Sequence, residues 1–194
     1  MTPFLAKAAW LLLAGGWIVI RYPYARRARR TPVASSRRGL RERLLMAVSF
    51  TGLGLLPVVY LVTGAPRFAD YPFQPVQAAL GVLVVAAALV MFRLSHKALG
   101  RNWSISLDVR DRHSLVTAGI YQHLRHPMYT AFWLWAVAQA LLLPNWVAGP
   151  AGLVGFGVLF FGRVGDEERM MLDTFGDQYR VYMARTRRII PLLY

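Results

Sequence analysis

The chain of 194 residues contains no cysteine. This absence excludes disulfide bonds, a thiol nucleophile and a cysteine-ligated metal site. Acidic residues are also scarce, with nine Asp and Glu against 23 Lys and Arg, whereas 56% of the residues are hydrophobic. So much apolar sequence exceeds what one small soluble core can bury, and the composition therefore indicates an integral membrane protein.

Several familiar motifs are missing as well. The sequence has no Gly-x-Ser-x-Gly elbow, no Walker loop and no zinc-protease helix, so hydrolase and nucleotide-triphosphatase functions find no support. His123 and His126 lack a carboxylate or third histidine at ligand spacing, and we expect no metal site. Gly155-Phe156-Gly157 follows no strand pattern, which favours close helix packing over a dinucleotide loop.

Three apolar runs in residues 1–92 are long enough to cross or nearly cross a bilayer: Phe4–Ile20, Leu44–Val62 and Val76–Phe92. The second run contains two glycines and Pro57, which predict a distorted helix. No small-residue cleavage site follows the first run, so we interpret it as a retained anchor.

The net charge of +14 is concentrated between the apolar runs. Arginines crowd the segment Arg21–Arg43, where Glu42 is the one acidic residue. A basic loop of this kind is typical of the cytoplasmic side, which places the amino terminus outside. No aromatic-interleaved motif for reading nucleic acid accompanies these charges, so we predict contact with anionic lipid and no role in binding nucleic acid.

Residues 93–194 contain two shorter apolar runs, Tyr129–Leu143 and Trp146–Phe161, joined by Pro144-Asn145. We expect a tight helical hairpin that enters from the cytoplasmic side and nearly spans the bilayer. The predicted fold is therefore an all-α integral membrane domain, 1–194, of about five helices with a cytoplasmic pocket. Residues 1–92 supply three spans and residues 93–194 the catalytic part.

Polar side chains flank this hairpin. Arg125-His126-Pro127-Met128-Tyr129 enters it, and Arg163 with Glu167-Glu168 follows it. Charged groups at a bilayer edge are costly and commonly functional. Arg163 and Glu167 are four residues apart and share one helix face, which favours joint binding of a zwitterionic or amphiphilic ligand. The alternatives are an N-terminal helix position for His126 before Pro127 and surface ion pairs for the acidic residues.

These residues resemble the isoprenylcysteine carboxyl methyltransferase family. The resemblance rests on Gly119-Ile120-Tyr121, the Arg-His-Pro-Met-Tyr sequence, the hairpin, and the Arg163 to Glu168 segment, with Phe175-Gly176, Tyr179, Tyr182 and Pro191 after them. It covers about the last half of the chain in motif detail. The chain departs from the family at Ala131, where glycine is usual, and at Pro144-Asn145, where Asn-Pro is frequent.

The resemblance implies transfer of a methyl group from S-adenosyl-L-methionine to the carboxylate of a prenylated cysteine. It implies that Arg163 holds the substrate carboxylate and that Arg163, Glu167 and His126 are the catalytic residues. The implied cofactor-binding residues are Ser106, His113, Ser114, Leu115, Val116, Tyr121, His126, Pro127, Met128, Tyr129 and Glu167. A carboxylate and a sulfonium are already reactive, so such a site needs positioning and water exclusion more than a base.

Three alternatives to this function stay open from the sequence. A methyltransferase of the same fold could act on another lipid or an amine, which would make Arg163 a poor substrate ligand. A membrane reductase could bind a nicotinamide cofactor in the corresponding cavity. A helical scaffold could hold anionic lipid or a partner through its arginine loop, although this leaves the charges on both hairpin arms unexplained. The acceptor and the oligomeric state do not follow from the sequence.

Overall fold

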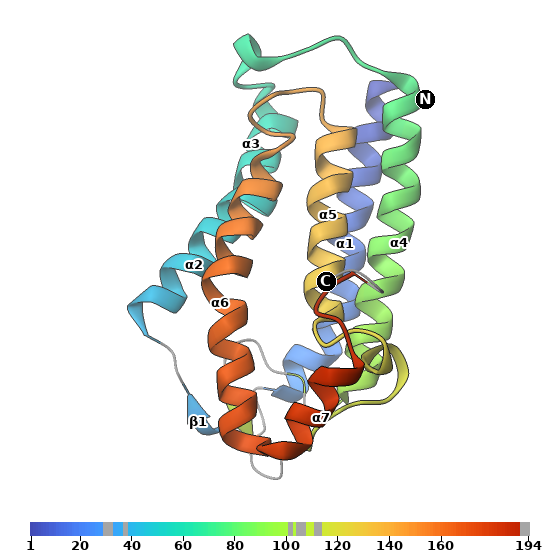
Figure 1. Cartoon of the computed structure of the whole chain (residues 1–194). Coiled ribbons are helices and arrows are strands. Elements are labelled where there is room, and N and C mark those ends of the chain that lie inside the picture. Colours follow the sequence, from blue (N-terminus) through green and yellow to red (C-terminus); the bar gives the residue numbers. More distant parts are fainter. Residues whose placement is uncertain (29–32, 37–38, 101–102, 104–107, 111–113, 191–194) are drawn as a thin grey trace.

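The computed structural model of the chain describes residues 1–28, 33–36, 39–100, 103, 108–110 and 114–190 (Figure 1). These residues form a nearly all-helical structure. The long helices are α1 (Pro3–Ala28), α2 (Leu40–Phe50), α3 (Leu56–Thr63), α4 (Pro75–Leu99), α5 (Pro127–Leu142) and α6 (Ala151–Phe175), followed by α7 (Asp177–Arg185). Short 3-10 turns cover Arg67–Ala69 (η2) and Gly119–Gln122 (η4). Of the residues singled out above, Ser106, His113 and Pro191 lie outside the described part of the chain.

Three helices are long and apolar enough to cross a membrane: α1, the continuous helix Leu40–Thr63 and α4. They correspond to the three apolar runs in residues 1–92. The helices extend past the runs, since α1 begins at Pro3 and ends at Ala28. A helix satisfies its backbone hydrogen bonds internally, so it continues from lipid into the polar interface without penalty.

The distortion expected in the second span is a π-helical turn, η1 (Thr51–Leu55), between α2 and α3. The Leu56 N–H donates to the Thr51 carbonyl, five residues back. In this register the next donor would be Pro57, which has no N–H for the Gly52 carbonyl. The buried Gln139 side chain of α5 donates to that carbonyl instead, over 3.0 Å. A polar residue within an apolar run thus supports the distorted turn.

The helices form two groups (Figure 1). Helices α1, α4 and α5 pack together, while α2 and η1 pack against α6. Gly52 and Gly155 make the second contact close, because their Cα atoms leave no room for a side chain. A Cβ on Gly155 would lie 2.8 Å from the Val48 carbonyl oxygen. This confirms the expectation that the glycines near Phe156 serve helix packing.

The hairpin of α5 and α6 differs from its predicted form in two ways. Its connection runs over residues 143–150, and α6 begins at Ala151 instead of Trp146. The reason is Asn145, whose side-chain oxygen accepts hydrogen bonds from the Val147 and Ala148 N–H groups and holds a turn there. Helix α6 also continues to Phe175, because residues 167–172 (Glu-Glu-Arg-Met-Met-Leu) are good helix formers.

The all-α prediction also missed a short antiparallel sheet. Strand β1 (Val33–Ser36) pairs with β2 (Asp108–Arg110), at the end of the molecule where α7 lies (Figure 1). Strands of three and four residues in polar segments have too few positions to display an alternating hydrophobic pattern. The sheet joins the two polar segments that connect the long helices.

Candidate active site

Glu168 organises the polar end of α6. Its carboxylate accepts from the Arg125 Nε at 3.0 Å and from the Arg188 Nη2 at 2.8 Å, and it lies 3.3 Å from the His126 Nε2. Burial alone would raise the pKa of the Glu168 carboxyl, but hydrogen bonds from His126, Arg188 and Arg125 outweigh it and lower that pKa to about 2. Glu168 therefore stays charged and fixes the start of α5 against α6.

The tail after α6 closes over this cluster. The N–H groups of Arg125 and His126 donate to the carbonyls of Arg187 and Arg188, at 2.7 and 2.9 Å. The Tyr182 hydroxyl donates to the Tyr121 carbonyl over 2.6 Å. Burial raises the pKa of Tyr182 to about 12, so its hydroxyl keeps its proton and remains a donor. The tail thus orients the backbone leading to the Arg-His-Pro-Met-Tyr sequence.

A second polar group faces the interior of the molecule. The Tyr129 hydroxyl donates to the Glu167 Oε2 over 2.5 Å. The same oxygen lies 3.9 Å from the Arg163 Nε, one helical turn earlier. The Arg163 Nη1 is in turn 3.0 Å from the Glu42 Oε1 of α2. One guanidinium is therefore flanked by two carboxylates, one from each side.

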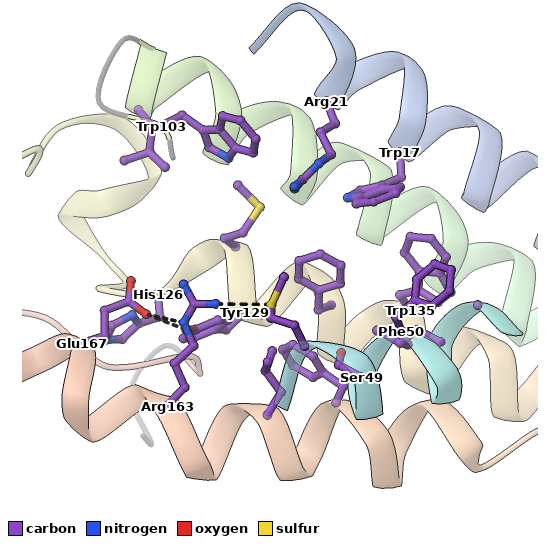
Figure 2. A pocket seen from close by; sticks show the side chains of 18 of the residues that line it. Trp17, Arg21, Ser49, Phe50, Trp103, His126, Tyr129, Trp135, Arg163 and Glu167 are labelled. Atoms are coloured by element: carbon purple, nitrogen blue, oxygen red, sulfur yellow. Dashed lines mark hydrogen bonds and ion pairs between the residues drawn. The ribbon is translucent and has the colours of Figure 1, made fainter. Parts of the chain in front are cut away.

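These groups line a cavity of about 790 Å³ between the two groups of helices. Figure 2 shows Tyr129, His126, Glu167 and Arg163 along one wall, with α1 across from them. Away from these polar side chains, the cavity lining becomes apolar. It includes the exposed apolar side chains Leu11 and Ile18 of α1, Leu55 of η1 and Val58 of α3. A single space is thus polar at one end and open to apolar surface at the other.

The structure brings most of the predicted site residues to this cavity. Those that line it are Ser114, Leu115, Val116, Tyr121, His126, Met128, Tyr129, Arg163 and Glu167. Pro127 is buried at the first position of α5, beside the cavity-lining residues. Arg163 and Glu167 share a helix face, as their spacing predicts. The sequence places them after the hairpin, whereas in the structure both lie within its second helix, α6.

Sequence reasoning missed three contributors to the site. Glu42 pairs with Arg163 although the two are separated by 121 positions. Trp103 lines the cavity from the polar segment after α4. Arg21, which the charge pattern assigns to the basic loop, lies in α1 and lines the cavity. The signal available for Arg21 was its spacing of four from Trp17, which places both on one helix face.

Comparison with known proteins places these features in context. A sequence model of the isoprenylcysteine carboxyl methyltransferase (ICMT) family matches residues 79–173. Every residue implied above for the site falls within that range. Glu42, Trp17 and Arg21 do not, so the first helices contribute groups outside the matched part.

Three curated proteins are similar to this chain. The probable protein-S-isoprenylcysteine O-methyltransferase of Oryza sativa subsp. japonica is 28% identical over 154 residues, which are 78% of each chain. The protein-S-isoprenylcysteine O-methyltransferase of Dictyostelium discoideum is 30% identical over 58% of this chain and 48% of its own. That of Schizosaccharomyces pombe is 37% identical over 42% of this chain and 34% of its own.

The fold is similar to that of a solved structure, the eukaryotic intramembrane Ras methyltransferase ICMT. The TM-score is 0.53 at 23% sequence identity, and the match covers 78% of this chain and 52% of the other. This likeness concerns the fold. The chain spans about half the length of that protein and of the Dictyostelium relative.

Proposed function

We propose that this chain belongs to the isoprenylcysteine carboxyl methyltransferase family, whose sequence model matches residues 79–173, and that it is a membrane enzyme that methylates the carboxylate of a prenylated cysteine or a similar amphiphile. The methyl donor is S-adenosyl-L-methionine in this proposal. The observation that carries it is the cavity, which joins a polar end at Tyr129, Arg163 and Glu167 to the apolar, exposed side chains of Leu11 and Val58.

The polar and aromatic side chains at this end of the cavity suit S-adenosylmethionine, which combines a zwitterionic amino acid part with a cationic sulfur. The Glu167 carboxylate offers an acceptor for an ammonium or hydroxyl group. The faces of Tyr121 and Tyr129 can stabilise a sulfonium as they would other cations. The volume of about 790 Å³ lies within the range of about 300–1,000 Å³ that small-molecule sites occupy. His126, Met128 and Ser114 to Val116 complete the proposed cofactor site, with Ser106 and His113 outside the described residues.

The donor supplies an activated methyl group, and a carboxylate is already nucleophilic at neutral pH. The protein is therefore not required to remove a proton. Its contribution is to hold the two groups in line and to exclude water, which can lower the barrier by about 7–11 kcal/mol. Tyr129 and Arg163 fix the Glu167 carboxylate, and the Glu168 cluster fixes the backbone from which His126 and Tyr129 project.

The apolar part of the cavity supports an acceptor that stays in the bilayer. Leu11, Ile18, Leu55 and Val58 line it and are 44–56% exposed. A prenyl chain can lie against these side chains while its polar end meets the donor. The basic residues between the spans favour a cytoplasmic position for the polar end, with the amino terminus outside.

Calorimetric titration of the detergent-purified protein tests the cofactor assignment. We expect micromolar binding of S-adenosylhomocysteine and no binding of NADPH. Binding of NADPH alone would favour a reductase, and binding of neither by the folded protein would favour a scaffold.

A further inference from the structure

Arg21 stands out because its charge has no acidic partner among the residues that the structure describes. The guanidinium carbon lies 5.0 Å from the centre of the Trp17 ring and 4.7 Å from that of Trp103. Among the described residues, Arg21 has neither a carboxylate neighbour nor a hydrogen-bond acceptor. It is partly buried and lines the cavity. A cation withdrawn from water without an anion is costly, which indicates that a ligand supplies the anion.

Trp17 adds a second unused donor on the same face of α1. Its indole Nε1 is buried and has no hydrogen-bond partner in the described part of the chain. Tryptophan N–H groups usually find an acceptor when they are buried. Figure 2 shows Trp17 and Arg21 side by side on α1, across the cavity from Tyr129, Arg163 and Glu167. A charged donor and a neutral donor therefore face the same space.

The aromatic neighbours hold Arg21 in place. The Trp103 ring is 3% exposed and stacks on His96 of α4, with ring centres 5.3 Å apart. The His96 Nδ1 is 2.8 Å from the Phe92 carbonyl oxygen, which fixes its ring. Contact of the Arg21 guanidinium with the rings of Trp17 and Trp103 limits its movement. The N–H groups of the guanidinium stay available for bidentate contact with a carboxylate.

The opposite wall has the reverse electrostatic character. There Glu42 and Glu167 flank the single charge of Arg163, at 3.0 and 3.9 Å. Two carboxylates against one guanidinium favour a positive ligand group, such as the donor sulfonium or ammonium. A carboxylate ligand is attracted more strongly to a cation that has no acidic neighbours.

We propose that Arg21, assisted by the Trp17 indole N–H, binds the carboxylate of the acceptor on the α1 side of the cavity. This inference rests on the proposed function, because it assigns the acceptor position within the same site. It predicts that the enzyme selects acidic amphiphiles and discriminates against amines. It also differs from the sequence-based expectation that Arg163 holds the carboxylate.

The assignment explains how the product would leave. An oxygen of the carboxylate forms the new bond to the methyl carbon, the sulfur–methyl bond breaks with its electron pair going to sulfur, and no proton moves. The acceptor thereby changes from an anion to a neutral ester. An ester makes no ion pair with Arg21, so its affinity for the α1 wall falls.

The test compares binding of N-acetyl-S-farnesyl-L-cysteine with that of its methyl ester to the purified full chain. We expect the acid to bind about tenfold or more tightly than the ester, since hydrogen bonds to charged groups are strong. Arg21→Gln should abolish this preference, because it weakens binding of the acid and leaves binding of the ester unchanged. Arg21→Lys should retain part of the preference. Trp17→Phe should reduce the preference severalfold. Arg26→Gln, an exposed position on the same helix, is the matched control and should keep it.

The outcomes separate this inference from the proposed function. If Arg21→Gln keeps the preference for the acid while Arg163→Gln loses it, the Arg21 assignment is wrong. The Arg21 assignment is also wrong if the wild type binds S-adenosylhomocysteine but binds the acid and the ester equally. Tighter binding of lysophosphatidic acid than of the farnesylated acid would likewise contradict it. If the acid preference depends on Arg21 but S-adenosylhomocysteine does not bind, the inference stands and the methyltransferase proposal fails.

Discussion

The Tyr129 hydroxyl donates to the Glu167 carboxylate over 2.5 Å, and both side chains line the cavity. Tyr129 ends the Arg-His-Pro-Met-Tyr sequence on α5, while Glu167 lies 38 positions later on α6. The hydrogen bond therefore joins the two arms of the hairpin at the point where we place the methyl donor.

The first prediction concerns donor affinity. Glu167→Gln keeps the size of the side chain but removes its charge, and we expect binding of S-adenosylhomocysteine to weaken about tenfold or more. Tyr129→Phe leaves the carboxylate in place and should have a smaller effect. Titration calorimetry measures both. Asp177→Asn, at a side chain that is 88% exposed, serves as the control. Unchanged affinity in Glu167→Gln would remove this residue from the cofactor site.

The second prediction concerns stability. Glu168 is buried among Arg125, His126 and Arg188, so Glu168→Gln leaves these groups without their anion. Breaking a buried ion pair from one side costs about 3–5 kcal/mol. We expect a large fall in the thermal unfolding midpoint. A fall no larger than that of Asp177→Asn would show that the cluster contributes little.

The same cluster predicts a dependence on pH. The pKa of Glu168 is about 2 in the folded protein against an ordinary value of 4.5, so the folded state favours the charged form. The resulting stabilisation is present above about pH 4.5 and is lost as pH falls toward about 2. Wild type should therefore lose stability in this window more steeply than Glu168→Gln. Parallel curves of unfolding midpoint against pH would contradict the assignment.

The third prediction concerns the Arg163–Glu42 pair, whose side chains are 10% and 9% exposed. Because the groups are in contact, Glu42→Gln and Arg163→Gln should be non-additive, with a coupling of about 0.5–3 kcal/mol in a double-mutant cycle. The exposed Asp177–Arg180 pair gives a comparison cycle with a coupling of about 0.5 kcal/mol or less. Additive effects of the Glu42 and Arg163 substitutions would mean that the pair does not join α2 to α6 energetically.

The fourth prediction concerns helix packing. Gly155→Ala would place a methyl group 2.8 Å from the Val48 carbonyl oxygen, which belongs to the backbone. We expect a loss of about 1–3 kcal/mol from this overpacking. Gly165→Ala lies on the same helix, and apart from the adjoining helix backbone no described atom lies within 4 Å of the new methyl, so it should be neutral or stabilising by up to about 1 kcal/mol. Unfolding midpoints compare the two, and equal effects would count against the close contact.

The membrane spans could be predicted because they depend on composition alone. The apolar run Val76–Phe92 lies within α4, and the run Leu44–Val62 lies within the helix Leu40–Thr63. Length and hydropathy are local properties that need no knowledge of neighbours. The hairpin connection could not be predicted to the residue, since its form depends on Asn145 bonding to Pro66 and Asp70 of a distant loop.

The site was predictable where its residues are close in sequence. His126, Tyr129, Arg163 and Glu167 fall near the two ends of one hairpin, so a loop-length argument brings them together. Glu42 could not be found in this way, because its contact with Arg163 depends on how α2 packs against α6. The charge pattern even suggests a different role for Arg21, since a basic residue near other arginines has the same appearance whether it faces lipid headgroups or a cavity.

The central claim is that the cavity brings a methyl donor and an acidic amphiphile together. The most direct measurement incubates the purified protein with methyl-labelled S-adenosylmethionine and N-acetyl-S-farnesyl-L-cysteine, and then quantifies base-labile methyl ester in the lipid phase. We predict labelled ester from the wild type and strongly reduced label from Glu167→Gln, with Asp177→Asn unaffected. Absence of labelled ester from a folded wild type that binds S-adenosylhomocysteine would contradict the account.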